Sequence, residues 1–520
     1  MKSTITIKSS LPAVLSGLLL YASSPGFVGF APLAWGALVP LLLIIKNAEP
    51  KRASLYGLIC GMVFYTLLLY WIVIVLGKYG YLPLWISIPA LLLLAFYLSL
   101  YIAAFAGICS WAMKRTQVLI IAPPLWVALD YLRGLLFTGF PWQDLGYSQF
   151  KFPVIIQLAD LFGHHALTFL ILVANCIIFS ACSLFIERRN EPAATNHRRA
   201  ILIGLIILTA FMGYNLVRFN QFADKLESAE SISVAVVQGN VPQDKKWVPE
   251  FQRKTLNDYI SLSESALKQE TVDLLIWPET ALPFYPLESH YYPELLKRLL
   301  NRQKVNLLTG APHRQTAPSL TKRDFYNSAF MINSSGITGR YDKQHLVPFG
   351  EYVPIRKFLP FLAPLVQTIG DFSAGQTPSL LAGNNALVGT LICYESIFPD
   401  LARKQAADGA NILVNITNDA WFGRSSAPEQ HFSMAVFRAV ENRRSLARAA
   451  NTGISGFIDP LGRITQKSPL FEALYLVDRL PLMDDSTFFT RIGHYFAPLC
   501  LMALLVLIII LARKKIVSHN

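Results

Sequence analysis

The sequence predicts an α-helical membrane bundle joined to one large soluble α/β domain. Of the 520 residues, 53% are hydrophobic and only 15% are charged, a charged fraction well below that of a soluble protein. The apolar residues form long runs within 11–219 and 491–512, whereas 220–490 has the mixed composition of a globular domain. We therefore expect a membrane part at 1–219, a soluble domain at 220–490, a final span at 491–512 and a short cytoplasmic tail at 513–520.

The membrane part contains enough apolar segments for about eight spans, since each spanning helix needs about 20 mostly apolar residues. The segments lie near 10–24, 27–45, 55–76, 83–112, 117–137, 163–186, 199–219 and 491–512. About seven of these predicted helices precede the soluble domain, and one follows it.

Basic residues alternate between the loops that join these segments, and this alternation predicts the orientation. The basic loops and ends contain Lys2, Lys8, Lys46, Lys51, Arg52, Lys114, Arg115, Arg188, Arg189, Arg198, Arg199, Arg513, Lys514 and Lys515. Such loops usually face the cytoplasm. We therefore expect both termini in the cytoplasm and, because an odd number of spans precedes it, the soluble domain on the extracytoplasmic side.

The net charge of +13 does not indicate nucleic-acid binding. Residues 220–490 contain 27 basic and 27 acidic residues, so the predicted soluble domain is neutral and the whole surplus lies beside the apolar segments. A nucleic-acid partner would require the positive charge on the folded domain. We therefore expect no nucleic-acid partner.

One of the six cysteines, Cys393, lies in the soluble domain. An extracytoplasmic cysteine without a partner in its own domain cannot form a conventional structural disulfide, which makes it a candidate reactive thiol. The other five lie in apolar segments, where cysteine usually packs as a small apolar residue: Cys60, Cys109, Cys176, Cys182 and Cys500.

Short apolar runs alternate with helical patterns across the soluble domain, and this alternation is typical of layered α/β folds. The predicted strands are 232–238, 273–277, 305–309, 325–333, 386–392 and 412–415, and the predicted helices are 250–269, 292–303, 397–408 and 427–446. Glu279, Lys343 and Cys393 each follow one of these strands. A thiol needs a base to ionise it, and acyl transfer needs positive charge where the oxyanion forms. A carboxylate, an ammonium group and a thiol can fill these roles, although these considerations alone do not select the three residues among 27 acids and 27 bases.

Longer motifs surround these three residues. They read Trp-Pro-Glu-Thr-Ala at 277–281, Tyr-Asp-Lys-Gln-His-Leu-Val-Pro-Phe-Gly-Glu-Tyr-Val-Pro at 341–354 and Ile-Cys-Tyr-Glu at 392–395. These motifs resemble the Glu-Lys-Cys motifs of the nitrilase superfamily. Together with the stretches at 139–142, 239–243, 246–247 and 418–423, they are similar to the apolipoprotein N-acyltransferases of bacterial inner membranes.

The resemblance covers nearly the whole chain and implies a fold, a reaction and a set of site residues. The family fold is a nitrilase-like αββα sandwich carried on eight transmembrane helices. Its enzymes move a fatty acyl chain from a phospholipid, typically phosphatidylethanolamine, to the α-amine of the diacylglyceryl-cysteine of an apolipoprotein. The resemblance assigns the general base to Glu279, the oxyanion stabiliser to Lys343 and the nucleophile to Cys393. It adds supporting or substrate-binding roles for Glu351, Tyr394, Glu395, Trp247 and Trp142.

This resemblance also predicts the location and partners of the protein. We expect a multi-pass protein of the bacterial inner membrane with its catalytic domain in the periplasm. The expected partners are the bilayer, a phospholipid donor and a diacylglyceryl-apolipoprotein acceptor, and the enzyme is expected to act as a monomer without a cofactor. The histidines show no spacing typical of metal ligands, so we expect no catalytic metal.

Two other functions share parts of this pattern. A membrane-anchored amidase or nitrilase would use the same three residues and let water attack the thioester, but one span would be enough to anchor it. A transporter or assembly factor could carry a catalytically inactive domain of this kind. The intact Glu279, Lys343 and Cys393 argue against that second alternative.

Overall fold

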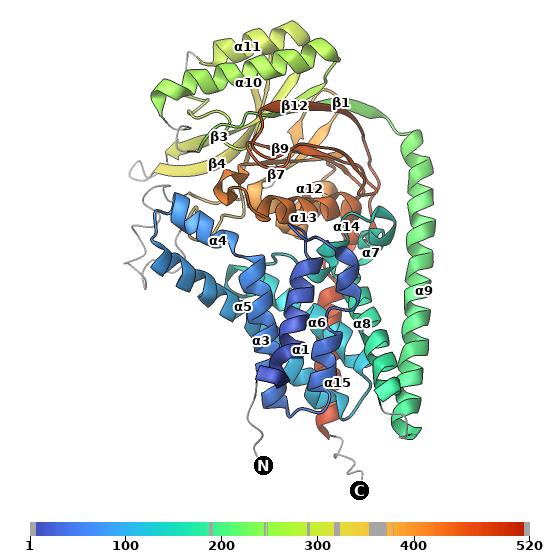
Figure 1. The fold of residues 1–520 in the computed structure, drawn as a ribbon. Coiled ribbons are helices and arrows are strands. Elements are labelled where there is room, and N and C mark those ends of the chain that lie inside the picture. Colours follow the sequence, from blue (N-terminus) through green and yellow to red (C-terminus); the bar gives the residue numbers. More distant parts are fainter. Residues whose placement is uncertain are drawn as a thin grey trace. The chain divides into compact units, whose positions relative to one another are not determined.

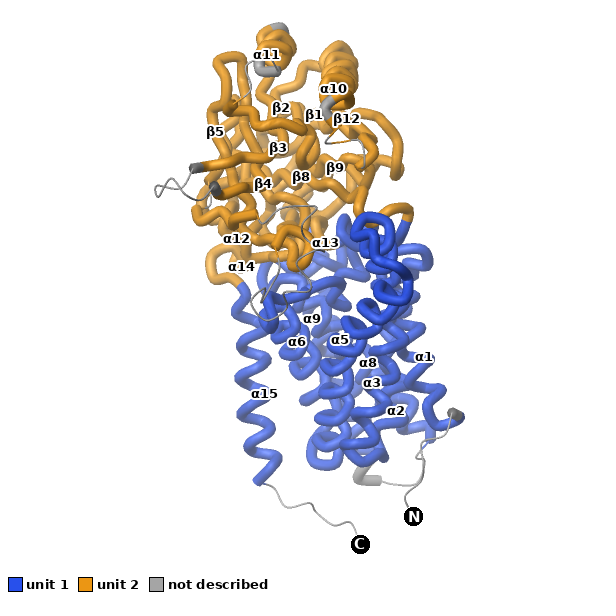
Figure 2. Tube along the Cα trace, turned by 90° about the vertical axis from the view of Figure 1, so that its left-hand side faces the viewer, with its two compact units in different colours: residues 1–219, 425–433, 494–520 blue, residues 220–424, 434–493 orange. Residues whose placement is uncertain are grey.

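The computed structural model describes residues 7–186, 191–243, 246, 248–288, 292–316, 323–352, 372–377 and 379–513. The chain forms two compact units, which Figure 2 distinguishes by colour. The membrane unit comprises 1–219, 425–433 and 494–520, and the catalytic unit comprises 220–424 and 434–493. A short segment from the middle of the soluble sequence, 425–433, thus belongs to the membrane unit.

All the regular secondary structure in the described residues of the membrane unit is helical. Its longer helices are α1 (Ile7–Ser23), α2 (Val39–Ile45), α3 (Pro50–Leu68), α5 (Leu84–Met113), α6 (Val118–Leu135), α8 (His165–Ile186), α9 (Glu191–Glu227, whose last residues belong to the catalytic unit) and α15 (Phe496–Arg513). Short helices join them: η1 (Ala31–Trp35), α4 (Trp71–Ile74), η2 (Val75–Tyr79), η3 (Leu136–Thr138), η4 (Leu145–Gln149), η5 (Pro153–Ile156) and α7 (Ala159–Phe162).

Five helices of the described chain are long and apolar enough to cross a membrane, and a bent pair formed by 50–68 and 71–79 makes up to six. The other two predicted spans correspond to α1, which has 17 residues, and to the short apolar helical stretch 31–45. The predicted membrane helical bundle is therefore confirmed, whereas its count of eight spans stays a prediction. The most apolar windows of α9 and α15 are only 17% and 22% buried, as expected for helices that contact lipid.

Helices α3 and α5 approach each other closely because α3 carries two glycines one turn apart. A Cβ atom on Gly57 would lie 2.4 Å from the carbonyl oxygen of Ile102, and one on Gly61 would lie 2.7 Å from the Cβ of Ser99. Small residues four positions apart allow this backbone approach in membrane helices, where packing rather than the hydrophobic effect drives association.

We expect Gly57→Ala to destabilise the protein by about 1–3 kcal/mol, because the new methyl group overlaps the Ile102 carbonyl and forces the two helices apart. Gly213→Ala in α9 is the matched control, since a Cβ there meets no described atom within 4 Å. Alanine has the higher helix propensity, so the control is expected to be neutral or slightly stabilised. Thermal unfolding in detergent measures both, and equal Tm values for the two variants would contradict the close packing.

The catalytic unit contains two six-stranded sheets, ordered β12-β1-β2-β3-β4-β5 and β11-β10-β9-β8-β7-β6. The first sheet contains β1 (Ser231–Gln238), β2 (Leu274–Ile276), β3 (Asn306–Thr316), β4 (Arg323–Asn333), β5 (Gly336–Asp342) and β12 (Leu474–Pro481). The second contains β6 (Leu381–Ala382), β7 (Leu387–Ile392), β8 (Ile412–Thr417), β9 (Ser445–Ala450), β10 (Gly456–Ile458) and β11 (Ile464–Lys467). The central pairs β1–β2, β2–β3, β7–β8 and β8–β9 are parallel, and the pairs toward the edges are antiparallel.

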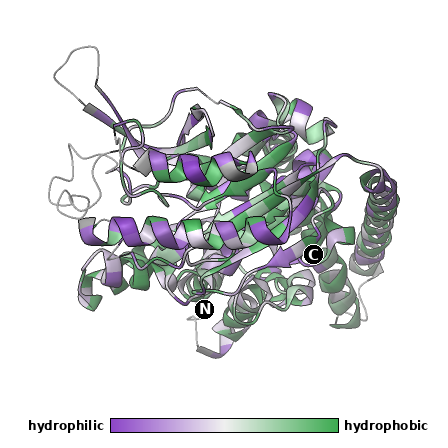
Figure 3. Ribbon diagram, turned by 90° about the horizontal axis from the view of Figure 1, so that it is seen from above, coloured by the Kyte–Doolittle hydropathy of each residue, from purple (hydrophilic) through white to green (hydrophobic). Residues whose placement is uncertain are grey.

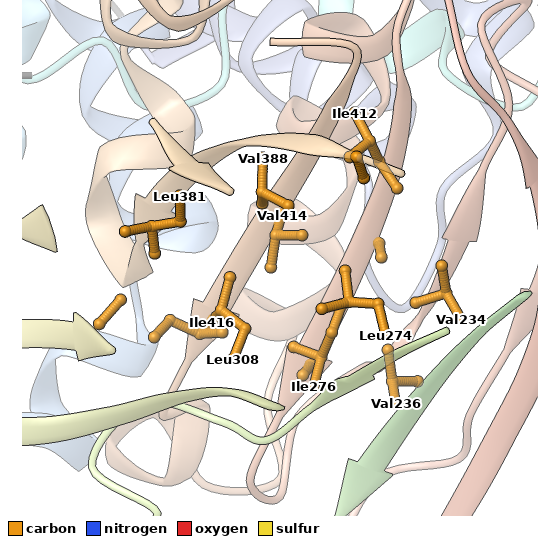
Figure 4. Close-up of a cluster of buried hydrophobic side chains, with 14 of the residues drawn as sticks. Val234, Val236, Leu274, Ile276, Leu308, Leu381, Val388, Ile412, Val414 and Ile416 are labelled. Carbon is orange, nitrogen blue, oxygen red and sulfur yellow. The ribbon is translucent and has the colours of Figure 1, made fainter. Parts of the chain in front are cut away.

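The two sheets pack face to face through aliphatic side chains from both (Figure 4). Val234, Ile276 and Leu308 of the first sheet share one buried cluster with Val388 and Val414 of the second. Alternate residues of these strands point into this cluster because successive side chains of a strand point to opposite faces. The strands that carry the candidate site are therefore held on a dry, rigid core.

Helices cover the outer faces of both sheets and complete the αββα sandwich that the resemblance implied. Figure 1 shows α10 (Pro249–Gln269) and α11 (Tyr292–Gln303) on one side, and α12 (Pro399–Ala407) and α13 (Ala427–Asn442) on the other. Leu256 and Leu300 of the first helix pair pack with Val237 of β1. Seen from above in Figure 3, these two helices alternate hydrophilic and hydrophobic residues, as expected for helices with one solvated face.

One predicted element differs from the structure. The helix predicted at 427–446 ends at Asn442, and β9 begins at Ser445. Arg443 adopts a φ of +50°, in the left-handed region, and turns the chain out of the helix into the strand.

Candidate active site

The buried Glu279 and Lys343 and the partly buried Cys393 come together in one group at the ends of their strands. Lys343 directly follows β5, Cys393 directly follows β7, and Glu279 comes three residues after β2. The Nζ of Lys343 lies 3.8 Å from the Oε1 of Glu279. The thiol of Cys393 interacts electrostatically with both residues.

Glu351 and Asn327 complete the polar contacts around Lys343. The ammonium group of Lys343 donates a hydrogen bond of 2.9 Å to Glu351 Oε1. The side-chain amide of Asn327, in β4, donates to Glu279 Oε1 at 2.7 Å and to Glu351 Oε1 at 3.0 Å. Burial alone would lower the pKa of Lys343, but the adjacent carboxylates of Glu351 and Glu279 raise it above its usual value. Lys343 is therefore a permanent cation of the site.

The second carboxylate oxygen of Glu279 is also held in place. The backbone N–H of Asn418, the residue after β8, donates to Glu279 Oε2 at 2.8 Å. With one oxygen bonded to Asn327 and the other to Asn418, and only 6% of the residue exposed, the carboxylate has a fixed orientation. A fixed, buried carboxylate of this kind can serve as a general base.

Cys393 is held in a backbone conformation that few side chains adopt. Its φ is +54°, in the left-handed region, where the strand β7 turns sharply into the short helix η7 (Cys393–Ile397). Strain of this kind is typical of functional positions. Burial, followed by the charge of Glu279, raises the pKa of the Cys393 thiol well above its usual value, and Lys343 opposes this. The thiol is therefore protonated at rest and needs a base.

Glu395 is a fully buried carboxylate that joins the turn at Cys393 to the loop of Lys343. Its Oε2 accepts from the backbone N–H of Ile392 at 2.7 Å, and its Oε1 accepts from that of Gln344 at 2.6 Å. The hydroxyl of Tyr341 also donates to it at 3.0 Å. Burial raises the pKa of Glu395 to about 7, against the opposing effect of these backbone donors. Glu395 is thus a positioning residue.

We expect Glu395→Gln to lower both Tm and acyl transfer. The amide group places an N–H donor against one of the backbone donors, which leaves a buried N–H without an acceptor at a cost of about 1–3 kcal/mol. The exposed Glu270→Gln, at the end of α10, is the matched control and should leave both quantities unchanged. Thermal unfolding and a transfer assay check the prediction, and a Glu395→Gln variant identical to the wild type in both would contradict it.

Tyr394 lies beside Cys393 in a small aromatic group. Its ring is 5.1 Å from that of Phe398 and 6.0 Å from that of His345, and the residue is 7% exposed. Burial, with the charge of Lys343, lowers the pKa of His345 to about 4, so its imidazole is neutral at physiological pH. Tyr394, His345 and Phe398 thus form one cluster of uncharged rings.

The sequence also predicts supporting roles for two tryptophans, Trp247 and Trp142. Trp247 lies outside the described residues. Trp142 lies in the membrane unit, where its indole N–H donates to Gln430 Oε1 at 2.8 Å. Trp71 Nε1 donates to the same oxygen at 3.1 Å. Residue 430 therefore links two indoles of the membrane unit.

A separate charged cluster lies in the membrane unit. Potential ligand atoms of Asp144, His164 and His165 lie within 4.8 Å of one another, a grouping that their sequence spacing did not reveal. Asp144 also forms a buried ion pair with Arg133 and bonds His164 Nε2 at 2.7 Å. Arg133 contacts Asp130 as well, at 3.4 Å. Within this cluster, Asp144 is thus already paired with a cation of the chain, Arg133.

Three residues of the site were not singled out from the sequence. Asn418 and Lys246 lie within the stretches that resemble the family, whereas Asn327 lies outside them. The ammonium group of Lys246 is buried and donates to the backbone carbonyl of Glu279 at 3.0 Å. Asn418 directly follows β8, which extends two residues beyond the predicted strand 412–415, and Asn327 lies inside β4.

Comparison with known proteins gives a consistent result over both units. Residues 16–177 match the apolipoprotein N-acyltransferase N-terminal domain, and residues 233–482 match the carbon-nitrogen hydrolase domain. The apolipoprotein N-acyltransferase of Geobacter metallireducens is 42% identical over 98% of this chain and 96% of its own. That of Methylococcus capsulatus is 34% identical over 94% and 93%. Among solved structures, Saccharomyces cerevisiae Nit3, a member of branch 10 of the nitrilase superfamily, aligns with 90% of its chain and 48% of this one, at 21% identity and a TM-score of 0.38.

Proposed function

Because the chain belongs to the apolipoprotein N-acyltransferase family, we propose that it moves a fatty acyl chain from a membrane phospholipid to the N-terminal α-amine of diacylglyceryl-cysteine in apolipoproteins, through a thioester on Cys393. The observation that carries the proposal is the partly buried thiol beside an oriented carboxylate and a permanent ammonium group. These are the groups that covalent acyl transfer requires. The roles follow the resemblance: Glu279 is the base, Cys393 the nucleophile and Lys343 the oxyanion stabiliser.

In the first half-reaction, Glu279 takes the proton of the Cys393 thiol and the sulfur attacks the carbonyl carbon of the donor ester. The carbonyl electron pair moves to oxygen, and the ammonium group of Lys343 stabilises the resulting oxyanion. The oxyanion then collapses, the C–O bond breaks, and the leaving alkoxide takes the proton from Glu279. A lysophospholipid departs and a thioester remains.

In the second half-reaction, the neutral α-amine of the acceptor attacks the thioester carbonyl. Glu279 takes a proton from the attacking nitrogen, the C–S bond breaks, and the Cys393 sulfur recovers a proton from Glu279. The products are an amide and the starting enzyme, so no external energy source is needed. A transfer divided in this way predicts ping-pong kinetics.

The membrane unit suits substrates that stay in the bilayer. Each buried acyl CH₂ contributes about 0.8 kcal/mol, so moving a long chain into water would cost on the order of 10 kcal/mol. An enzyme with several apolar spanning helices avoids that transfer. We infer a location in the bacterial inner membrane, and the charge of the loops supports a catalytic unit on the periplasmic side with both termini in the cytoplasm. The proposal includes phosphatidylethanolamine as donor and a monomeric enzyme.

Intact mass spectrometry of the purified enzyme mixed with phospholipid, without any acceptor, tests the proposal. The expected result is a fatty-acyl mass increment that maps to Cys393 and disappears when a diacylglyceryl-cysteine peptide is added. An unmodified Cys393 under conditions where the peptide is acylated would overturn the thioester mechanism. Release of free fatty acid without amide product would instead support the amidase alternative.

A further inference from the structure

Lys246 is a buried cation next to the catalytic group that the proposed mechanism does not use. In the sequence it lies between strand β1 and helix α10. Its residue is 1% exposed. Its Nζ donates one hydrogen bond, of 3.0 Å, to the backbone carbonyl of Glu279. Among the described residues, no carboxylate lies within ion-pair distance of it, although an ammonium group carries three donors. A buried charge without an ionic partner is costly and usually serves a purpose.

The charges of the side chains around Glu279 indicate a role for Lys246. The contacts around the base comprise two carboxylates, Glu279 and Glu351, and one ammonium group, Lys343, which is bonded to Glu351 at 2.9 Å. Ionising Cys393 in this group, or building an oxyanion there, adds negative charge to a buried site. Lys246 supplies a second positive charge that is not bound to a carboxylate of the described residues.

We propose that Lys246 is a second cationic residue of the active site, which stabilises the thiolate of Cys393 and the negative charge that develops on the acyl group, while Lys343 stays paired with Glu351. The part that concerns the acyl group rests on the proposed function. The part that concerns the thiolate does not, and it can be measured with a small alkylating reagent.

The electrostatics around Lys246 agree with this role. Burial lowers the pKa of Lys246 to about 8, and the charges of Glu279 and Cys393, the two ionisable groups that interact with it, oppose that shift. Attraction between two charges is mutual, so the ammonium group of Lys246 must favour the thiolate in turn. Because the pKa is lowered, the charge is present below about pH 8 and is lost above it. The stabilisation of the Cys393 thiolate by Lys246 should therefore also be present below about pH 8 and lost above it.

Three variants of Lys246 separate its charge from its hydrogen bond and its size. Lys246→Gln keeps a donor for the Glu279 carbonyl but removes the charge. Lys246→Arg keeps both and stays charged at every accessible pH. Lys246→Met removes both. Lys254→Gln in α10, which removes an exposed lysine paired with Asp258, is the control.

The experiment measures the rate of iodoacetamide alkylation at Cys393, mapped by peptide mass, in the full-length enzyme from pH 6 to pH 10. At pH 7 we expect Lys246→Gln and Lys246→Met to react at least about tenfold more slowly than the wild type, since a nearby opposite charge shifts a pKa by about one unit or more. Lys246→Arg should keep the wild-type rate at pH 7. Its rate relative to the wild type should then rise above about pH 8, where Lys246 loses its proton.

Each outcome decides the proposal. Alkylation of Lys246→Gln at the wild-type rate overturns the proposal. An equal decrease of the alkylation rate in Lys246→Gln and Lys246→Arg also overturns it, because it would indicate a packing role. If Lys246→Gln does not fold, the alkylation rate of Lys246→Arg relative to that of the wild type still tests the role of the charge through its pH dependence. Acyl-enzyme formation from phospholipid is measured in parallel. Alkylation that behaves as expected in an enzyme that phospholipid does not acylate would retain the role of Lys246 and reject the proposed function.

Discussion

Cys393→Ser is expected to lose acyl transfer by at least about 10³-fold and to form no acyl-enzyme with phospholipid. The thiol of the wild type is already hard to ionise, because burial and the charge of Glu279 raise its pKa. A serine hydroxyl is far less acidic than a thiol, so Glu279 cannot generate an alkoxide at a comparable rate. The substitution changes one atom, and the backbone at φ +54° accepts serine as it accepts cysteine.

The test compares transfer rates and acyl-enzyme mass for Cys393→Ser and Cys182→Ser. Cys182, in α8 of the membrane unit, is partly exposed and serves as the matched control. We expect the control to keep the wild-type rate. Transfer at the wild-type rate by Cys393→Ser would refute the assignment of the nucleophile.

Glu279→Gln is expected to lower kcat/KM by about 10²–10⁴-fold, the usual contribution of a general base. The carboxamide has nearly the same size and keeps an oxygen that can accept a hydrogen bond from Asn327 or Asn418. It cannot take the thiol proton, so both the formation and the consumption of the thioester should become slow. The carboxamide nitrogen faces the other of these two donors, so a modest loss of Tm is expected beside the loss of proton transfer.

Single-turnover measurements resolve the two half-reactions of Glu279→Gln. Glu294→Gln in α11 removes an exposed carboxylate paired with Lys297 and is the control. Thermal unfolding establishes that the variant is folded. A folded Glu279→Gln enzyme whose thioester forms at the wild-type rate would assign the base to another group.

Much of the fold follows from patterns in the sequence, and the parts that do not have identifiable physical reasons. The apolar runs and the alternation of short strands with helices predict the membrane bundle and the α/β layers. Strand β9 was not predicted. Its sequence, Ser-Leu-Ala-Arg-Ala-Ala, is rich in good helix formers, so strand propensity does not indicate it. All its residues are buried, so it also lacks the alternation of apolar and polar residues that indicates a strand. Tertiary packing between β8 and β10 decides its conformation.

Part of the candidate site could likewise be predicted from the sequence, and part could not. Glu279, Lys343 and Cys393 follow strands, and the family resemblance selected them among many acids and bases. Asn327 could not be found in this way, because it lies within β4 and one amide in a strand carries no local pattern. Its role depends on the two carboxylates that β2 and the loop after β5 bring to it. Geometry of this kind exists only once the sheet has formed.

The assignment of residues 425–433 to the membrane unit has a consequence for biogenesis. The indoles of Trp71 and Trp142 donate to Gln430, and the second of these bonds joins residues 288 positions apart. At synthesis rates of about 5–20 residues per second, Trp142 leaves the ribosome roughly 15–60 s before its acceptor exists. The membrane helices can therefore reach their final hydrogen-bonded state only after most of the catalytic sequence has been made. A nascent chain that stops before residue 430 therefore lacks the acceptor of both hydrogen bonds.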